Sequence, residues 1–176
     1  GSSSRTGSAT DGLGGYGSGA DGSGAGRAAP PVTLSAMRVI GLQADLVWED
    51  PAANRDALRD RVLAAGRRSA GGLVVLPEMW PTGFSMHAER IAEPEGGPSE
   101  GFLVECAAAC GAAVAGSVAQ RREGWARPRN VFLLATPEGG VHRYAKIHPF
   151  TYGGEDRHYE GGTALVTLRV AGVRVT

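Results

Sequence analysis

The chain has 176 residues, enough for one ordinary domain, and its 18 Lys and Arg residues balance its 18 Asp and Glu residues. A zero net charge argues against nucleic acid and anionic membranes as partners, because both attract proteins with a basic excess, and no apolar run approaches the roughly 20 residues that span a bilayer. The two cysteines, Cys106 and Cys110, are too few for a disulfide scaffold and indicate a reducing compartment, for which we expect the cytoplasm.

The first 34 residues form a Gly- and Ser-rich segment. Ten of the 28 glycines lie before Val32, and the segment holds one aromatic residue, Tyr16. Such a composition cannot bury enough apolar surface to offset the entropy of ordering, so we predict a disordered tail over residues 1–34. The stretch "GSGADG", Gly17 to Gly22, matches a dinucleotide-binding pattern by letter, but no strand precedes it and no helix follows, which argues against a cofactor site.

A strand and a helix are predicted at the start of the folded part. Residues 38–44, "RVIGLQA", are apolar and β-rich enough for a buried strand. A helix should follow, with Asp50 as its cap, Pro51 in its first turn and Gly66 near its end. Three apolar residues share one face of this helix: Leu58, Val62 and Ala65.

A second strand–helix–strand unit comes next. The strand "LVVL", residues 73–76, is halted by Pro77. We predict a helix from Ser99 to Cys110, capped by Ser99 and ended by Gly111. Residues 112–120 are rich in small apolar side chains and predict a closely packed third strand.

The remaining elements are predicted strands. Residues 130–136 and 141–146 should pair as a hairpin about the turn 137–140, and residues 164–176 should form two strands about Ala171-Gly172. The order β-α-β-α-β-β-β-β-β predicts an α/β layer protein whose helices cover a sheet.

Glu78 is a candidate general base. It follows a buried strand in "VVLPEMWPTGF" and has Met79, Trp80 and Phe84 as close neighbours in sequence. Partly apolar surroundings raise the pKa of a carboxyl group and suit it to proton transfer near neutral pH. The alternative is a loop carboxylate that caps a turn.

Lys146 is a candidate oxyanion donor. It ends the strand "VHRYAK", where a surface lysine is the ordinary alternative. The "IHPF" that follows would allow the ammonium to point into the mouth of the sheet, where a cation stabilises an anionic transition state.

Three motifs, "LVVLPEMWPTGF", "RYAKIHPF" and "GGEDRHYEGG", together resemble the carbon–nitrogen hydrolase (nitrilase) superfamily from about Met37 to Thr176. The resemblance implies the N-terminal half of an α-β-β-α sandwich, with a domain over residues 37–176 that is incomplete at its C-terminus. Trp80 and the "GGEDRHY" loop are most similar to the omega-amidase-type branch, which hydrolyses small 2-oxo amides such as 2-oxoglutaramate. The resemblance implies no cofactor and no metal, and it allows a homodimer.

The family uses a Glu–Lys–Cys triad. The resemblance implies that Glu78 is the general base and Lys146 the oxyanion-stabilising lysine, while Glu155 matches a second glutamate that orients the lysine or binds substrate. The family's nucleophilic cysteine follows the strand that here reads "GVRVT", so we expect it beyond the chain end. Cys106 and Cys110 lie four apart on one helix face, where small thiols pack as apolar residues.

Other readings of the chain remain open. An N-carbamoyl-amine hydrolase of the same superfamily would share Glu78 and Lys146, and a non-catalytic binding module, or pseudo-enzyme, would need neither. Four residues are candidate metal ligands, but their spacing fits no compact ligand motif, and we expect the histidines to hydrogen-bond locally instead: His142, His148, His158 and Glu155. Four arginines indicate a solvated hairpin tip rather than a nucleic-acid patch: Arg121, Arg122, Arg127 and Arg129.

Overall fold

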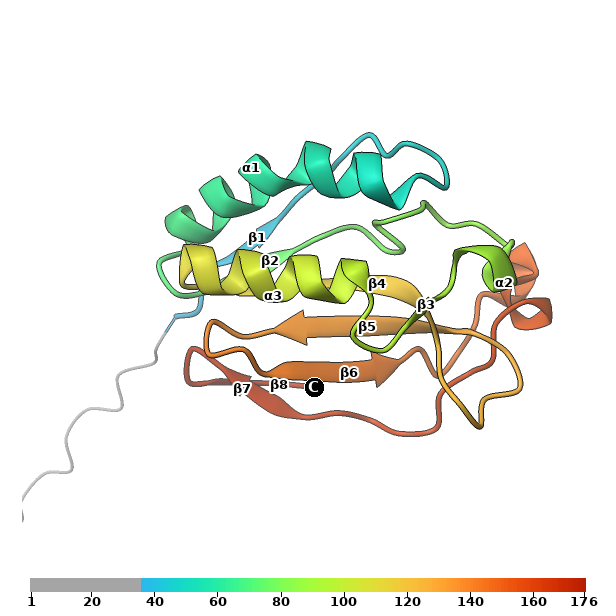
Figure 1. The fold of residues 1–176 in the computed structure, drawn as a ribbon. Helices are drawn as coiled ribbons and strands as arrows, with labels where there is room; N and C mark the ends of the chain where they lie inside the picture. The colour runs from blue at the N-terminus through green and yellow to red at the C-terminus, as the bar shows by residue number, and fades with distance from the viewer. Residues whose placement is uncertain (1–35) are drawn as a thin grey trace, which may run out of the picture. The chain divides into compact units, whose positions relative to one another are not determined.

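The computed structural model describes residues 36–176 (Figure 1). The predicted disordered tail lies outside the described residues. The helices are α1 (Pro51–Ser69), α2 (Ala88–Ile91) and α3 (Pro98–Cys110), with short 3-10 turns η1 (Thr151–Gly153) and η2 (Glu155–Arg157). The strands are β1 (Val39–Gly41), β2 (Leu73–Val75), β3 (Glu93–Pro94), β4 (Ala113–Arg121), β5 (Arg129–Ala135), β6 (Val141–Ala145), β7 (Leu168–Val170) and β8 (Val173–Val175).

One mixed sheet organises the fold, with strand order β1-β2-β4-β5-β6 and β3 beside the far end of β4. Strands β1, β2 and β4 are parallel, and β3 is parallel to β4, while β5 runs antiparallel to both of its neighbours, β4 and β6. Helices α1 and α3 cover one face, and the β7–β8 hairpin lies on the other side (Figure 1). The predicted α/β layer architecture is therefore confirmed. No helix within residues 36–176 has the length and apolar character needed to cross a membrane.

The two faces of the sheet carry different side chains because successive strand residues point to opposite sides. On the helix side, Val114 and Val118 of β4 pack with Leu58 of α1 and Phe102 of α3. On the opposite side, Ala115 packs with other apolar residues: Leu73, Ala113, Leu134 and Val170. This second face continues toward the ends of β5 and β6, where the polar side chains of the candidate site lie.

Helix α1 begins at the predicted cap, and Gly66 lies near its end as predicted, three residues before Ser69. Asp50 Oδ1 accepts a hydrogen bond from Ala53 N at 3.0 Å, and Pro51 is the first helical residue. A side chain at Gly66 would collide with the Cys110 side chain of α3, so this glycine allows close contact between two helices.

Helix α3 differs from the prediction at its start. The residue before the helix is Gly97, and Ser99 lies inside the first turn, where its Oγ donates to Glu93 Oε1 at 2.7 Å. The predicted serine cap is therefore wrong, because the Glu93 carboxylate from β3 binds both Ser99 N and Ser99 Oγ. The helix ends as predicted, with Gly111 in the left-handed region at φ 66°.

Gly116, in the middle of β4, provides a test of the packing between the sheet and the segment after β2. A Cβ at this position would lie 2.6 Å from Trp80 Cδ1 and 2.9 Å from Leu76 Cβ. Overpacking of this kind costs about 1–3 kcal/mol, so we expect Gly116→Ala to lower the free energy of unfolding by that amount in urea denaturation. The control Gly101→Ala on α3 meets no heavy atom within 4 Å and should stabilise by about 0.5–1 kcal/mol. Equal midpoints for the two variants would contradict the packing argument.

Candidate active site

Glu78 is placed by a sharp turn after β2. The strand pairing continues to Leu76, whose N–H donates to Ala115 O at 2.7 Å. Met79 has a positive φ of 52°, and its N–H donates to Ser117 Oγ of β4 at 2.8 Å. A positive φ is energetically unfavourable for a bulky residue such as Met79, so the surrounding contacts must stabilise this conformation. The turn leaves the Glu78 side chain half-exposed at the lip of the sheet.

Lys146 directly follows β6 and is fixed by backbone hydrogen bonds on both sides. Its N–H donates to Asn130 O at 2.9 Å, and its carbonyl accepts from Gly162 N at 2.8 Å. The first of these bonds extends the β5–β6 pairing, so the side chains of Lys146 and Asn130 lie next to each other on the same face of the sheet.

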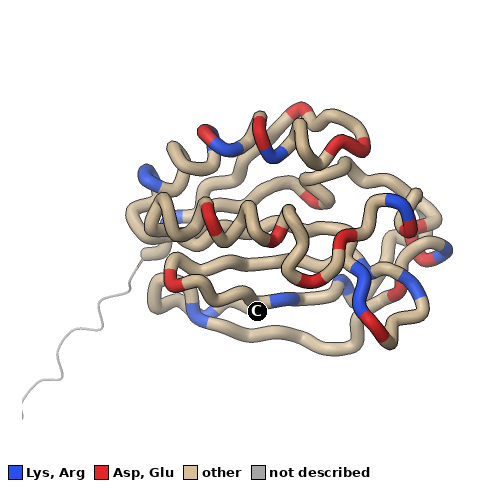
Figure 2. The backbone as a smooth tube through the Cα atoms, in the orientation of Figure 1, with Lys and Arg blue, Asp and Glu red and all other residues tan. Residues whose placement is uncertain are grey.

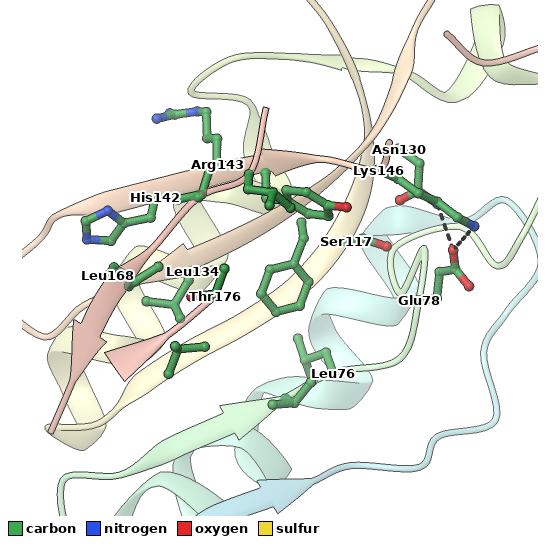
Figure 3. Close-up of a pocket in the computed structure, with 16 residues that line it drawn as sticks. Leu76, Glu78, Ser117, Asn130, Leu134, His142, Arg143, Lys146, Leu168 and Thr176 are labelled. Carbon is green, nitrogen blue, oxygen red and sulfur yellow. Dashed lines mark hydrogen bonds and ion pairs between the residues drawn. The ribbon is translucent and has the colours of Figure 1, made fainter. Parts of the chain in front are cut away.

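Three predicted site residues meet at one point. Lys146 Nζ lies 2.9 Å from Glu78 Oε1 and 2.9 Å from Glu155 Oε2. Figure 3 shows the lysine reaching the Glu78 carboxylate from the strand side. Two carboxylates separated by 77 positions in the chain therefore share one ammonium. The Glu78–Lys146 separation is within the roughly 5 Å expected of two groups that serve one small reacting centre.

The charge state of Lys146 follows from its neighbours. Partial burial by itself lowers the pKa of the ammonium, but hydrogen bonds and Coulombic attraction from Glu78 and Glu155 outweigh burial, and the pKa lies above its ordinary value of 10.5. Lys146 is therefore a cation at neutral pH and a hydrogen-bond donor only. Two of its three N–H groups are used by the carboxylates, which leaves one for another acceptor. The Phe84 ring centroid lies 5.3 Å from Nζ.

Glu155 is fully buried at the start of η2. Its Oε2 also accepts from Phe150 N at 2.5 Å, and its Oε1 accepts from Asn130 Nδ2 at 3.1 Å. A buried carboxylate is tolerated when it is paired and hydrogen-bonded, as here. These contacts favour the first of its two implied roles, orientation of the lysine.

Two cavities open beside the Glu78–Lys146 pair. One, of about 610 Å³, lies on the second face of the sheet and includes Ser117, Asn130 and Phe132 in its wall (Figure 3). The other, of about 600 Å³, is bordered by Phe84 and the segment from His148 to Tyr152. Glu78 and Lys146 line both cavities. The pair is thus accessible to a small molecule.

Neither cysteine belongs to this site. Cys106 is fully buried in the core beneath the helices, and burial raises its pKa to about 11. A thiol with so high a pKa carries little thiolate, which is the nucleophilic form. Cys110 packs against the same core and lines neither cavity. The expected apolar packing is confirmed for both residues, with Cys106 fully buried and Cys110 half-buried.

The histidine side-chain hydrogen bonds within residues 36–176 belong to His87, so the local hydrogen bonding expected of His142, His148 and His158 is not found. Within residues 36–176, no group of three or more His, Cys, Asp or Glu side chains is arranged to hold a metal ion. Arg129 is less solvated than predicted, because its guanidinium lies 4.4 Å from the Trp125 ring centroid and 2.7 Å from Glu160 Oε1. Arg127 donates to the carbonyls of Asp156 and Arg157. Positive and negative residues are interspersed along the described backbone (Figure 2).

The sequence reading missed Asn130. Its Nδ2 donates to Glu78 Oε1 at 2.8 Å and to Glu155 Oε1 at 3.1 Å, from a side chain that is buried. The amino-acid composition also pointed to Lys146. Of the 18 Lys and Arg residues in the chain, 17 are arginines, and Lys146 is the one lysine. A compact ammonium at this single position contrasts with arginine everywhere else.

The carbon–nitrogen hydrolase family model matches residues 37–169. The chain is 35% identical over 145 residues to omega-amidase YafV of Escherichia coli (strain K12), which covers 81% of this chain and 53% of that protein. It thus spans about half the length of the curated relatives it matches.

Solved structures agree with this match. A CN-hydrolase superfamily protein of Xanthomonas campestris, solved with an arsenic adduct in its active site, superposes with a TM-score of 0.73 at 36% identity, covering 78% of this chain and 51% of that one. The amidase of Nesterenkonia sp. AN1, in a butyramide complex of a mutant, superposes with a TM-score of 0.64 at 23% identity, covering 78% and 53%, and supports the fold alone. The chain belongs to the carbon–nitrogen hydrolase family.

Proposed function

We propose that residues 37–176 form the N-terminal half of a cysteine amidase that hydrolyses the carbon–nitrogen bond of a small carboxamide, such as a 2-oxo amide, and releases ammonia. The observation that carries the proposal is the Lys146 ammonium held between Glu78 and Glu155 at the edge of two cavities. The omega-amidase relatives supply the substrate class.

In this proposal Lys146 stabilises negative charge on the substrate. When a thiolate attacks the amide carbon, the carbonyl oxygen becomes an oxyanion, and the unused N–H of the ammonium can donate to it. A preorganised donor of this kind contributes about 10²–10³ in rate. The raised pKa of Lys146 supports this role, because the group then stays charged throughout the working pH range.

Glu78 transfers the protons. It takes the proton of the attacking thiol and gives a proton to the amide nitrogen, so that ammonia leaves and an acyl thioester remains. A water molecule then loses a proton to Glu78 as it attacks the thioester. Glu78 passes this proton to the departing sulfur, so that the acid leaves and the thiol and the carboxylate are regenerated. The half-exposed carboxylate beside both cavities supports this assignment, and the thiol comes from a residue other than Cys106 or Cys110.

The experiment is an ammonia-release assay on the full-length protein with 2-oxoglutaramate, and with an N-carbamoyl amine as the competing substrate. We expect the 2-oxo amide to be preferred in kcat/KM. Preference for the carbamoyl compound would replace the proposed substrate class, and no turnover of either would favour a binding module.

We also expect Cys106→Ala and Cys110→Ala to keep the kcat of the full-length protein within about threefold, since neither thiol reaches the site. Complete loss of turnover in a folded variant would place the nucleophile in α3 and contradict the proposal.

A further inference from the structure

We propose that Asn130 is a positioning residue that holds Glu78 and Glu155 around Lys146 and leaves one chosen oxygen of Glu78, Oε2, for proton transfer. The inference rests on the proposed function for its kinetic consequences, but the arrangement itself can be tested without turnover.

The side-chain amide of Asn130 has two N–H groups, and both are committed. One donates to Glu78 Oε1 at 2.8 Å and the other to Glu155 Oε1 at 3.1 Å. Asn130 is 3% exposed, so water does not compete for these bonds. Within residues 36–176, Lys146 and Asn130 are the two side chains that hydrogen-bond to both carboxylates.

A lysine alone does not fix two carboxylates. Its ammonium rotates on a flexible stem and attracts as a point charge, so many arrangements of Glu78 and Glu155 satisfy it. The two carboxylates also repel each other, and one cation leaves the trio with a net negative charge. A planar amide between them adds two directional bonds without adding a second cation. A second cation would stabilise the ionised form of Glu78 and weaken it as a base.

The bonds distinguish the two oxygens of Glu78. Oε1 accepts from both Lys146 Nζ and Asn130 Nδ2, whereas Oε2 accepts from no residue in the described part of the chain. The Glu78 side chain is 53% exposed, so without the amide it would be free to turn toward solvent. Figure 3 shows Lys146 and Asn130 approaching the carboxylate from the same side, which leaves its other oxygen unbound.

The backbone of Asn130 reinforces this arrangement. Its carbonyl accepts from Lys146 N at 2.9 Å, so the amide and the ammonium are set by the same β5–β6 pairing. A misplacement of about 1 Å in a reacting group can cost about 10²-fold in rate. One residue thus controls the relative position of all three charged groups.

The first test uses this chain with Asn130→Ala and Asn130→Asp and measures the Lys146 pKa by NMR. Lys146 is the one lysine of the 176 residues, so lysine labelled with ¹³C and ¹⁵N gives a single side-chain signal. Loss of the amide in Asn130→Ala should release the carboxylates and lower the Lys146 pKa from its raised value. The third carboxylate of Asn130→Asp should raise it further. No change in either variant would overturn the proposal.

The second test measures kcat and KM in the full-length protein. We expect Asn130→Ala to lower kcat by about 10- to 100-fold, the usual effect of removing a supporting hydrogen bond, with KM changed by less than about threefold. Asn130→Asp should lose at least as much at neutral pH and recover part of it at acidic pH, where the new carboxyl group is protonated and can donate one bond. A kcat within about threefold of the wild type in Asn130→Ala would overturn the proposal.

Asn54→Ala is the matched control. Asn54 is equally buried, at 1% exposed, and its amide donates to Val47 O and Pro81 O rather than to either carboxylate. This variant should lose stability but keep the Lys146 pKa, kcat and pH profile. A wild-type protein that turns over no amide would remove the proposed function, while the NMR titration would still decide whether Asn130 positions the carboxylates.

Discussion

Lys146→Met is expected to abolish amide hydrolysis in the full-length protein and to destabilise the fold. The substitution keeps most of the apolar stem and removes the charge. It leaves Glu155, fully buried, with two neutral donors and no cation. Breaking a buried pair by removing one partner costs about 3–5 kcal/mol. Loss of the oxyanion donor should lower kcat by at least about 10²–10³.

The same variant should change how stability depends on pH. The folded-state pKa of Lys146 is raised above its ordinary 10.5, so proton binding favours the folded state. This contribution is complete below about pH 10.5 and is lost as pH rises through the folded-state value. The difference in unfolding free energy between wild type and Lys146→Met should therefore shrink only above pH 10.5.

Urea denaturation of the chain from pH 7 to 11 measures the loss of stability in Lys146→Met and how that loss depends on pH. Arg122→Met is the control, because Arg122 and its partner Glu95 are exposed at 59% and 37%, and surface pairs are worth about 0–1 kcal/mol. A Lys146→Met variant that is as stable as Arg122→Met would show that the lysine is an ordinary strand-end charge.

The resemblance to the family implied that Glu78 and Lys146 serve one site. The fold brings them together because β2 and β6 run in the same direction and both residues follow the C-terminal ends of these strands. Sequence reasoning found the Asp50 cap and the Gly111 stop of the two long helices, since these depend on one or two neighbouring residues. Glu155 was identified through its motif, but its complete burial was not, because the burial depends on how η2 packs against β5.

Asn130 was missed because its role depends on strand register. A turn over residues 137–140 would pair Thr136 with Val141, whereas the structure pairs Ala135 with Val141. The loop is bent by Gly139, at φ 89°, and by the hydrogen bond from Thr136 N to Gly140 O. A shift of one residue moves every side chain of a strand to the other face, so the position of Asn130 beside Lys146 could not be fixed from the sequence.

The same substitution at two positions, Glu78→Gln and Glu155→Gln, should separate the proton-transfer role of Glu78 from the structural role of Glu155. Glu78 is 53% exposed and has an oxygen without a partner among residues 36–176, so its amide variant should keep nearly the wild-type stability. Its kcat in the full-length protein should fall by about 10²–10⁴, because glutamine cannot accept and return the proton.

Glu155 accepts from three donors, so no orientation of a glutamine satisfies all of them: one of its two terminal atoms is itself a donor. Hydrogen bonds to charged groups contribute about 1.5–3 kcal/mol each, and we expect Glu155→Gln to lower the unfolding free energy by at least that amount. The measurements are urea denaturation and steady-state kinetics on both variants. A large stability loss in Glu78→Gln together with an unaffected Glu155→Gln would reverse the two roles, since the buried carboxylate would then be dispensable and the half-exposed one structural.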